Sequence, residues 1–144
     1  MPVKQPDACR AWQLLMRFFF VQRAHLPEWA DEAGLSPVQC HVLHLLEPDK
    51  PASMNRLADA LSCDASNVTG LVDRLEARGL VQRRPSADDR RVKVLELTAA
   101  GSRLRARLLG RMTAEHLPLA KLSARDQRTL VRILERLVEE SSFR

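Results

Sequence analysis

Cysteines are few, tyrosine is absent and long apolar runs are missing in this chain of 144 residues. The three cysteines, Cys9, Cys40 and Cys63, are odd in number and widely spaced, which argues against a disulfide framework and is typical of a reducing compartment. No apolar run reaches the roughly 18 residues that a membrane-spanning helix needs, and the start, MPVKQPDACR, lacks the basic-then-apolar order of a secretory signal. We therefore expect a cytoplasmic protein with no membrane partner.

Motifs of catalysis and of metal binding are also missing. There is no G-x-S-x-G, no phosphate-cradling glycine loop and no H-E-x-x-H, and no nucleophile is evident beside His25, His41, His44 or His116. Cys40 and His44 are four residues apart, but His41 points about 100° away from Cys40 on a helix, and no acidic cluster adds ligands. We therefore expect neither an enzyme, a metal site nor a cofactor.

The net charge of +5 and the isoelectric point near 9.7 favour a polyanionic partner. Basic and acidic residues balance at four each in 1–35 and nine each in 36–98, whereas 99–144 holds ten basic and five acidic residues. Within the middle segment, two aspartates stand against a group of cations at 83–93: Arg83, Arg84, Arg90, Arg91 and Lys93. Such a group favours nucleic acid, although charges that only keep a hairpin soluble are the alternative interpretation.

Residues 64–98 predict a helix followed by two strands joined by a charged turn. The helix 64–78 has an apolar and a polar face, formed by Val68, Leu71, Val72 and Leu75 and by Ser66, Asn67, Thr69 and Asp73. Asp64 or Ser62 can cap its start, and Gly79 can end it. Strands are expected at 80–84 and 92–98, with a turn at 85–91. This order of elements describes a winged helix, a shape suited to DNA.

Helical segments precede this region. We expect one long helix at 8–33, kinked or interrupted near Pro27, and a second helix that starts from a capping box of Ser36 and Gln39 and reaches 47. Ser53 can cap a third helix that runs through Leu61. The helix 64–78 then becomes the recognition helix of a helix-turn-helix.

Two further helices are expected after the strands. One starts at Thr98 and carries an apolar stripe toward Leu117 until Pro118 breaks it, and the other starts at Ser123 and has a clear apolar face. The first and last helices cannot bury all of their apolar faces against the winged helix. Pairing with the same helices of a second subunit would bury them, whereas a monomeric helical bundle is the alternative.

Four residues of the hairpin, Asp89, Arg91, Leu97 and Thr98, fit the pattern D-x-R-x5-L-T. This pattern resembles the wing signature of the MarR family of multiple-antibiotic-resistance regulators, and LSPVQCHVLHLL at 35–46, SMNRLADALS at 53–62 and VTGLVDRLEARGLVQR at 68–83 are similar to that family in order and spacing. The resemblance implies a mainly α fold with a small β-hairpin wing (α+β). It further implies a single domain over 1–144, with a winged helix-turn-helix at 36–98 flanked by dimerisation helices at 8–33 and 99–141.

Candidate DNA contacts in the helix 64–78 follow from side-chain chemistry. Short hydroxyl and amide groups in its first turns can reach base edges and phosphates, which predicts contacts by Ser66, Asn67 and Thr69, with Asn67 the best reader of a base. Gly70 is costly in a helix interior and suits a close approach to DNA, although relief of packing is the alternative. Arg74 can meet phosphate or pair with a neighbouring carboxylate.

By resemblance, the wing completes this interface. Arg91 would enter the minor groove, whose narrow form attracts guanidinium, and Asp89 would hold the Arg91 side chain extended. Arg90 would then meet phosphate, and Ser53 at the start of the third helix joins the predicted set. A purely structural bridge between Asp89 and Arg91 is the alternative.

Three mechanisms compete for the control of DNA binding. The resemblance implies a small aromatic or phenolic ligand between the dimer helices and the winged helix, with candidate contacts from Trp12, Met16, Phe19, Phe20, His41 and His44. An aromatic stripe at helical spacing is nonetheless more often core. Oxidation of Cys9 loosely resembles the peroxide-sensing branch, but that branch uses tyrosines around its cysteine. The third candidate is the incomplete metal site at Cys40.

Together these observations predict a sequence-specific DNA-binding regulator. The leading interpretation is a homodimeric repressor of a palindromic operator in double-stranded DNA, released by a small aromatic ligand. A cysteine-based redox sensor of the same fold is one alternative. A winged-helix module that binds only proteins is the other.

Overall fold

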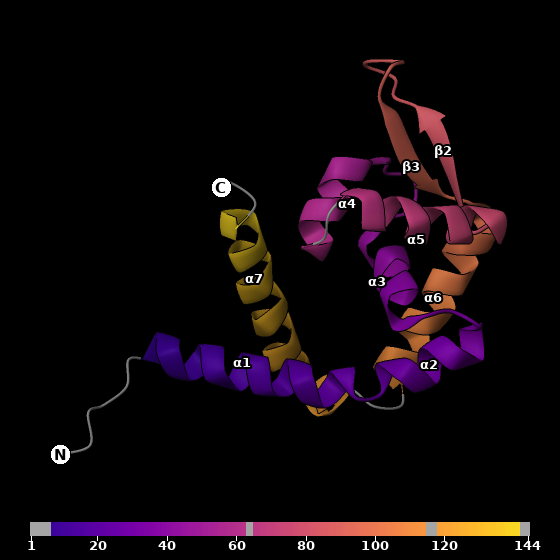
Figure 1. Ribbon diagram of the computed structural model, residues 1–144. Helices are drawn as coiled ribbons and strands as arrows, with labels where there is room; N and C mark the ends of the chain where they lie inside the picture. Colours follow the sequence, from indigo (N-terminus) through magenta and orange to yellow (C-terminus); the bar gives the residue numbers. More distant parts are fainter. Residues whose placement is uncertain (1–6, 63–64, 115–117, 142–144) are drawn as a thin grey trace. The chain divides into compact units, whose positions relative to one another are not determined.

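The computed structural model describes residues 7–62, 65–114 and 118–141, and the chain divides into two compact units, Met1–Leu109 and Gly110–Arg144. The first unit contains helices α1 to α5, a three-stranded antiparallel sheet and most of α6 (Figure 1). The mainly helical architecture with a small sheet confirms the fold class expected from the sequence. The interpretation of 1–144 as a single domain stays a prediction.

The chain starts with two helices. Helix α1 is Asp7–Arg23 and α2 is Leu26–Ala33, so the helical segment expected at 8–33 is interrupted near Pro27, which is one of the two outcomes expected there. Pro27 lies in the first turn of α2, where a missing backbone N–H costs nothing, because the first N–H groups of a helix have no partner within it. The proline therefore begins the second helix and does not kink the first. Gly34 closes α2 in the left-handed conformation, with φ 64°, as predicted.

Local caps place the next helices. Helix α3, Pro37–Leu45, begins with the predicted capping box, in which Ser36 Oγ accepts from Gln39 N at 3.2 Å and Gln39 Oε1 accepts from Ser36 N at 2.8 Å. Helix α4, Met54–Leu61, begins at Ser53, whose Oγ accepts from the backbone N of Arg56 at 3.1 Å. Both predicted caps are confirmed.

Helix α5, Ala65–Ala77, corresponds to the predicted recognition helix. Its candidate cap Asp64 and the third cysteine, Cys63, lie outside the described residues. Ser62, the other candidate cap, instead ends α4 in the left-handed conformation with φ 51°. Gly79, with φ 68°, follows the end of α5, which confirms its predicted role as a stop.

The sheet has the strand order β1-β3-β2. Strands β2, Val81–Pro85, and β3, Lys93–Leu97, form the predicted hairpin, in which Arg83 pairs with Leu95. Strand β1, Ala52–Ser53, pairs with the other edge of β3 and was not predicted. Two residues are too few to show the alternation from which a strand is recognised.

The core of the first unit joins α3, α5 and the sheet. Its fully buried side chains include Leu43, Val68, Val72, Leu75 and Leu95. Helix α6, Ala99–Ala114, starts so close to this core that a Cβ on Gly101 would lie 1.9 Å from the carbonyl oxygen of Leu80. Only glycine allows that approach.

The second unit contains the end of α6, the 3-10 helix η1 (Pro118–Lys121) and α7 (Ala124–Ser141). Pro118 starts η1, whereas the predicted extension of α6 toward Leu117 lies outside the described residues. Ser123 Oγ accepts from Asp126 N at 3.2 Å and caps α7 as predicted. Within the described ranges, no helix is both long and apolar enough to cross a bilayer.

Candidate nucleic-acid interface

Helix α5 separates a buried apolar face from an exposed polar one. Val68, Val72 and Leu75 are 0% exposed, which confirms the predicted apolar stripe. The opposite face is solvent-exposed and contains Ser66, Asn67, Thr69, Gly70 and Arg74. The predicted DNA contacts of α5 therefore all lie at the surface, and their role in binding stays a prediction.

Gly70 makes no close packing contact with the described residues outside its own helix backbone. Among those residues, no atom would lie within 4 Å of a Cβ built on Gly70, so alanine would fit without moving them. Asn67, Gly70 and Arg74 follow each other at three- and four-residue spacing and so share one helix face. The lack of a side chain at Gly70 leaves a low point on that face, which is the geometry that a close approach to DNA requires.

Asp89 acts on the backbone of the wing. Its Oδ1 accepts from the backbone N–H of Arg91 at 2.9 Å, and the carbonyl of Asp89 accepts from Val92 N at 3.0 Å. Among the described residues, no ion pair joins the Asp89 carboxylate to the Arg91 guanidinium, and the expected extension of the Arg91 side chain by Asp89 stays a prediction. An aspartate that binds the N–H two residues ahead forms an Asx-turn, which shapes the hairpin tip.

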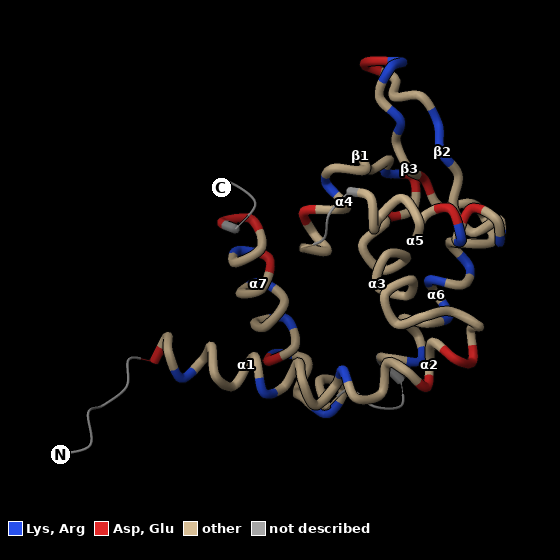
Figure 2. Tube along the Cα trace, viewed as in Figure 1, with Lys and Arg blue, Asp and Glu red and all other residues tan. Residues whose placement is uncertain are grey.

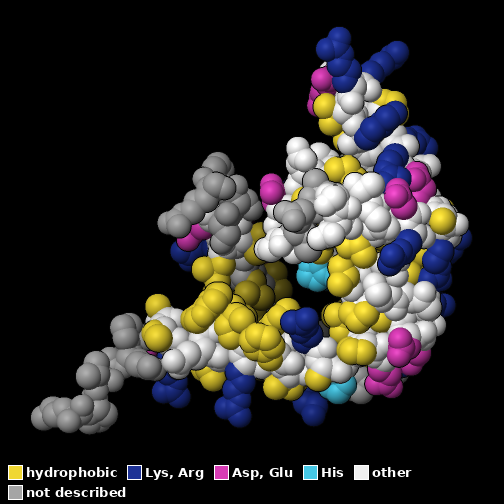
Figure 3. Space-filling model, viewed as in Figure 1, with side chains coloured by type: hydrophobic (Ala, Val, Ile, Leu, Met, Phe, Trp, Pro, Cys, Tyr) yellow, Lys and Arg dark blue, Asp and Glu magenta, His cyan; other side chains and the backbone are white. Residues whose placement is uncertain are grey.

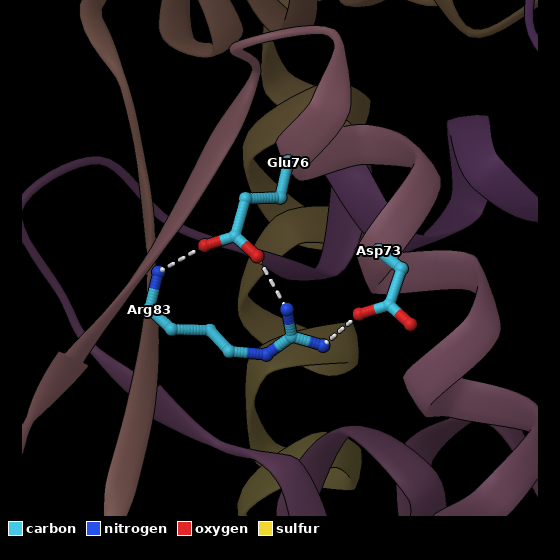
Figure 4. A network of polar contacts seen from close by, with 3 residues as sticks. All are labelled: Asp73, Glu76 and Arg83. Carbon is cyan, nitrogen blue, oxygen red and sulfur yellow. Dashed lines mark hydrogen bonds and ion pairs between the residues drawn. The ribbon is translucent and has the colours of Figure 1, made fainter.

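The positive charge of the hairpin is divided between a paired base and an open tip. At the base, Arg83 forms ion pairs with Asp73 and Glu76 of α5 (Figure 4), and Arg84 Nε lies 3.3 Å from Glu96 Oε2 of β3. Near the tip are three exposed cations that form no ion pair with any described residue: Arg90, Arg91 and Lys93. The positive charge that the sequence predicted over 83–93 is therefore neutralised at the base of the hairpin and exposed near its tip.

Figure 2 shows acidic and basic segments meeting at the end of the β2–β3 hairpin, and Figure 3 shows basic side chains gathered over that hairpin. The acidic part, Asp88 and Asp89, lies within the turn, and Asp88 N donates to Ser86 Oγ at 3.3 Å. These contacts leave the tip compact and exposed. A compact basic tip of this kind is suited to enter a narrow groove of a polyanion, where the negative potential is strongest.

The last two residues of the D-x-R-x5-L-T pattern anchor the wing. Thr98 Oγ1 donates to the carbonyl of Gly79 at 2.6 Å and accepts from Gly101 N at 3.0 Å, so it joins the end of α5 to the start of α6. Leu97 is half-buried and packs against the core. Within one pattern, therefore, Asp89 and Arg91 lie at the tip and the final two residues hold the base.

Two arginines take structural partners that the sequence did not reveal. Asp73 is the sequence neighbour of Arg74, which was expected to meet phosphate or a neighbouring carboxylate, but Asp73 and Glu76 both bind Arg83. Arg78 instead donates to the carbonyls of Gly34 at 2.5 Å and Ala33 at 3.0 Å, which caps α2. These partners are 44 and 45 residues away along the chain. No local spacing could have predicted them.

The candidate effector residues lie on α1 and α3. Trp12 is 63% exposed, Phe19 51% and Phe20 57%, whereas Met16 is half-buried, so within the described residues of the first unit the aromatic stripe is not part of the core. The two phenyl rings meet edge to face, with centroids 5.8 Å apart. Exposed apolar surface of this kind is typical of a site that binds a protein partner or a ligand.

His41 and His44 favour their neutral forms, although both rings keep part of their surface exposed. Burial lowers the pKa of His41 below its ordinary value, and the charge of Arg23 lowers it further. For His44, burial is again the main cause of the lowered pKa, followed by Arg105 and His41. For both imidazoles, burial and the neighbouring positive charges therefore lower the pKa and favour the neutral form.

The cysteines differ in accessibility. Cys40 is buried, and burial raises the pKa of its thiol, which disfavours the reactive thiolate. Cys9 is exposed in the first turn of α1. In the described part of the chain, no three His, Cys, Asp or Glu side chains lie close enough together to hold a metal ion.

The sequence model of the MarR family matches residues 35–93, which contain α3, α4, α5, β2 and the turn of the hairpin. The HTH-type transcriptional repressor NicR of Pseudomonas putida is 29% identical over 128 residues, which cover 88% of this chain and 80% of NicR. A MarR-family regulator from Silicibacter pomeroyi superposes with a TM-score of 0.74 at 23% identity, over 93% of this chain and 90% of its own.

A mutant of S. aureus MepR bound to an oligodeoxyribonucleotide superposes with a TM-score of 0.61 at 21% identity, over 90% of this chain and 96% of its own. At such identities, the two superpositions show a common fold. They confirm the winged helix expected from the sequence.

Proposed function

The chain belongs to the MarR family of transcriptional regulators, and on this premise we propose that it is a homodimeric repressor of a palindromic operator in double-stranded DNA. One observation carries the proposal: the exposed polar face of α5 and the exposed cations of the wing tip occur in one compact unit. A helix and a hairpin so combined can contact a major groove and the adjoining minor groove. The repressor NicR and the DNA-bound MepR support the assignment.

Direct titration tests DNA binding. DNA from upstream of the protein's own coding sequence is the first probe, and unrelated DNA of equal length is the control. Binding to the probe should persist at moderate salt, whereas binding to the control should be lost because it depends on phosphate contacts alone. A winged-helix module that binds only proteins would bind neither the probe nor the control DNA.

The dimer is proposed from exposed apolar faces. α1 exposes Trp12, Phe19 and Phe20, and α7 exposes a second set that includes Val131, Ile133, Leu137 and Val138. Apolar faces of this extent are typical of subunit interfaces. Sedimentation equilibrium should give a dimer, and footprints should show half-site centres about 10 bp apart. A stable monomer that protects one half-site would contradict the proposal.

The proposed effector is a small aromatic carboxylate or phenol bound near α1 and α3. Neutral His41 and His44 can exchange hydrogen bonds with it, and the charges of Arg23 and Arg105 favour an anion. Such a ligand would weaken DNA binding if it binds the DNA-free arrangement of the dimer more tightly. In a thermal-shift assay, benzoate should stabilise the protein more than uncharged benzamide of the same shape. Equal shifts would exclude an anion site.

Redox control through Cys9 is the second candidate, supported by the exposure of its thiol. If it operates, peroxide should abolish operator binding reversibly and Cys9→Ser should prevent this. Cys40→Ser serves as the control, because the buried thiol of Cys40 should not react.

A further inference from the structure

Arg83 connects the wing to the helix proposed to read DNA. It lies on β2, near the base of the hairpin, and its guanidinium points toward α5 (Figure 4). Nη2 of Arg83 donates to Asp73 Oδ1 at 2.6 Å, and Nη1 donates to Glu76 Oε2. The Arg83 side chain is 24% exposed, less than those of its two partners. The Arg83 guanidinium therefore faces α5 and does not point toward a DNA phosphate.

The connection includes the backbone of β2. In the strand order β1-β3-β2, strand β2 lies at the edge of the sheet, and the N–H of Arg83 donates to Glu76 Oε1 at 3.2 Å. Glu76 therefore holds Arg83 by its main chain and its side chain together. Two contacts on one residue restrict both the position and the rotation of the strand relative to α5.

Electrostatics strengthens this contact. Burial by itself would lower the pKa of Arg83, but hydrogen bonds and charge interactions with Asp73 and Glu76 outweigh it and raise the pKa. The guanidinium is thus held between two carboxylates and gives little net charge to the DNA-facing surface. Arg84, the next residue, differs, because its side chain is 60% exposed and its partner Glu96 belongs to the hairpin itself.

We propose that Arg83 is a positioning residue for DNA recognition, which sets the wing at a fixed distance and angle from α5 so that both reach adjoining grooves of one half-site. The inference rests on the proposed function. It adds a role that Arg83 performs without touching DNA. Recognition by two elements loses less free energy to ordering when they are held in the bound arrangement beforehand.

The first test compares Arg83→Gln with Arg84→Gln. Both variants remove one positive charge from β2, so the change in net charge is the same, and only Arg83→Gln releases the wing from α5. Arg84→Gln should weaken operator binding by no more than about threefold, whereas Arg83→Gln should weaken it by about tenfold or more beyond that. Equal losses in the two variants would overturn the proposal.

A double-mutant cycle measures the coupling between Arg83 and Arg91 in operator binding, a quantity that a simple loss of stability would not change. Arg91→Ala should weaken binding strongly in the wild-type background, but by less than about threefold beside Arg83→Gln, because a released wing no longer delivers Arg91 to the groove. If Arg91→Ala costs the same in both backgrounds, Arg83 does not position the wing.

Asp73→Asn tests the same contact without removing the arginine, and applies even if Arg83→Gln fails to fold. It deletes a negative charge from α5, so electrostatics alone predicts tighter DNA binding. Positioning predicts weaker binding, because one of the two partners of Arg83 is lost. Asp59→Asn is the control, since Asp59 is an exposed acid on α4. Tighter binding in both variants would overturn the proposal.

These outcomes separate this inference from the proposed function. A wild-type protein that binds no operator would overturn both. Wild-type binding together with equal effects of Arg83→Gln and Arg84→Gln would overturn only the role of Arg83.

Discussion

Helices α5 and α7 show the same amphipathic pattern with opposite outcomes. On α5 the apolar face is completed within the chain, where Val68 and Val72 are 0% exposed. On α7 Val131 remains 54% exposed and Ile133 47%. Helical periodicity indicates that a face will be buried, but not against what. The difference teaches that α5 is part of a self-sufficient core, whereas α7 keeps an apolar face for the partner that the proposed dimer would supply.

The largest effect that tests this comparison is expected at the α5 core. Leu75→Ala should destabilise the protein by about 2–5 kcal/mol, because it leaves a cavity among side chains that are already fully buried. Urea unfolding measures the change. Ile133→Ala on α7 is the matched truncation and should change the stability of the isolated chain by no more than about 0.5 kcal/mol. It should instead raise the dimer dissociation constant, and equal destabilisation by both variants would contradict the contrast.

The next largest effect is expected at Gly101, which lies against the core, whereas Gly70 lies on an exposed helix face. Gly101→Ala should destabilise the protein by about 1–3 kcal/mol, because the new Cβ meets the Leu80 carbonyl and the start of α6 must move. Thermal unfolding gives the result directly. A neutral outcome would mean that α6 can shift away from the core at little cost.

Wing and core should respond differently to the loss of a charge at the tip. Arg91→Ala removes an exposed side chain, so stability should change by no more than about 0.5 kcal/mol, whereas a lost groove contact should weaken operator binding by roughly 1–3 kcal/mol per subunit and reduce the salt slope. Titrations at several salt concentrations measure both. A folded, dimeric Arg91→Ala protein with wild-type affinity and salt slope would show that the wing is not part of the DNA surface.

Gly70→Ala sharpens the contrast within α5 itself. Its methyl group would meet no atom of the described residues outside the helix backbone, so the helix should gain up to about 1 kcal/mol in stability from the better helix former. Operator binding should nevertheless weaken, because the methyl group raises the low point between Asn67 and Arg74. Stability and affinity that rise together would show that DNA does not approach Gly70.

The smallest effect is expected at α3, whose histidines lie outside the buried face. The unfolded chain protonates His44 near its ordinary pKa of 6.5, whereas the folded chain protonates it at lower pH. The contribution of His44 to stability should therefore be fully present above pH 6.5 and be lost as the pH falls below 6.5, because the unfolded state then binds more protons than the folded state. Urea unfolding at about pH 7.5 and about pH 5.5 should show a smaller difference in His44→Gln than in the wild type. An unchanged difference would exclude His44 as a cause.

Helix ends were predictable because their causes are local. The capping box of Ser36 and Gln39, the caps at Ser53 and Ser123 and the stop at Gly79 all depend on atoms within a few residues of one another. The interruption expected near Pro27 is present at residues 24 and 25, but the proline lies in the first turn of the following helix and not at the break itself. The same residue type fits both positions, and only the backbone distinguishes them.

The exposed face of α5 was also predictable, since a 3.6-residue period separates its polar from its apolar side chains before any packing occurs. The roles of individual charges were not. Arg83 and Arg91 are the same residue type on one hairpin, yet Arg83 is held by two carboxylates of α5 and Arg91 is exposed at the tip. Asp89, expected to hold a side chain, binds a backbone N–H.

Sequence alone therefore established the elements of this protein and the sides on which they are apolar, because propensity, capping and periodicity act within one or two helical turns. Tertiary structure decided which charges are neutralised and which remain open to solvent. An ion pair such as Arg83 with Asp73, or the capping of α2 by Arg78, depends on segments that meet only after the chain has folded. Distance along the chain carries no information about such contacts.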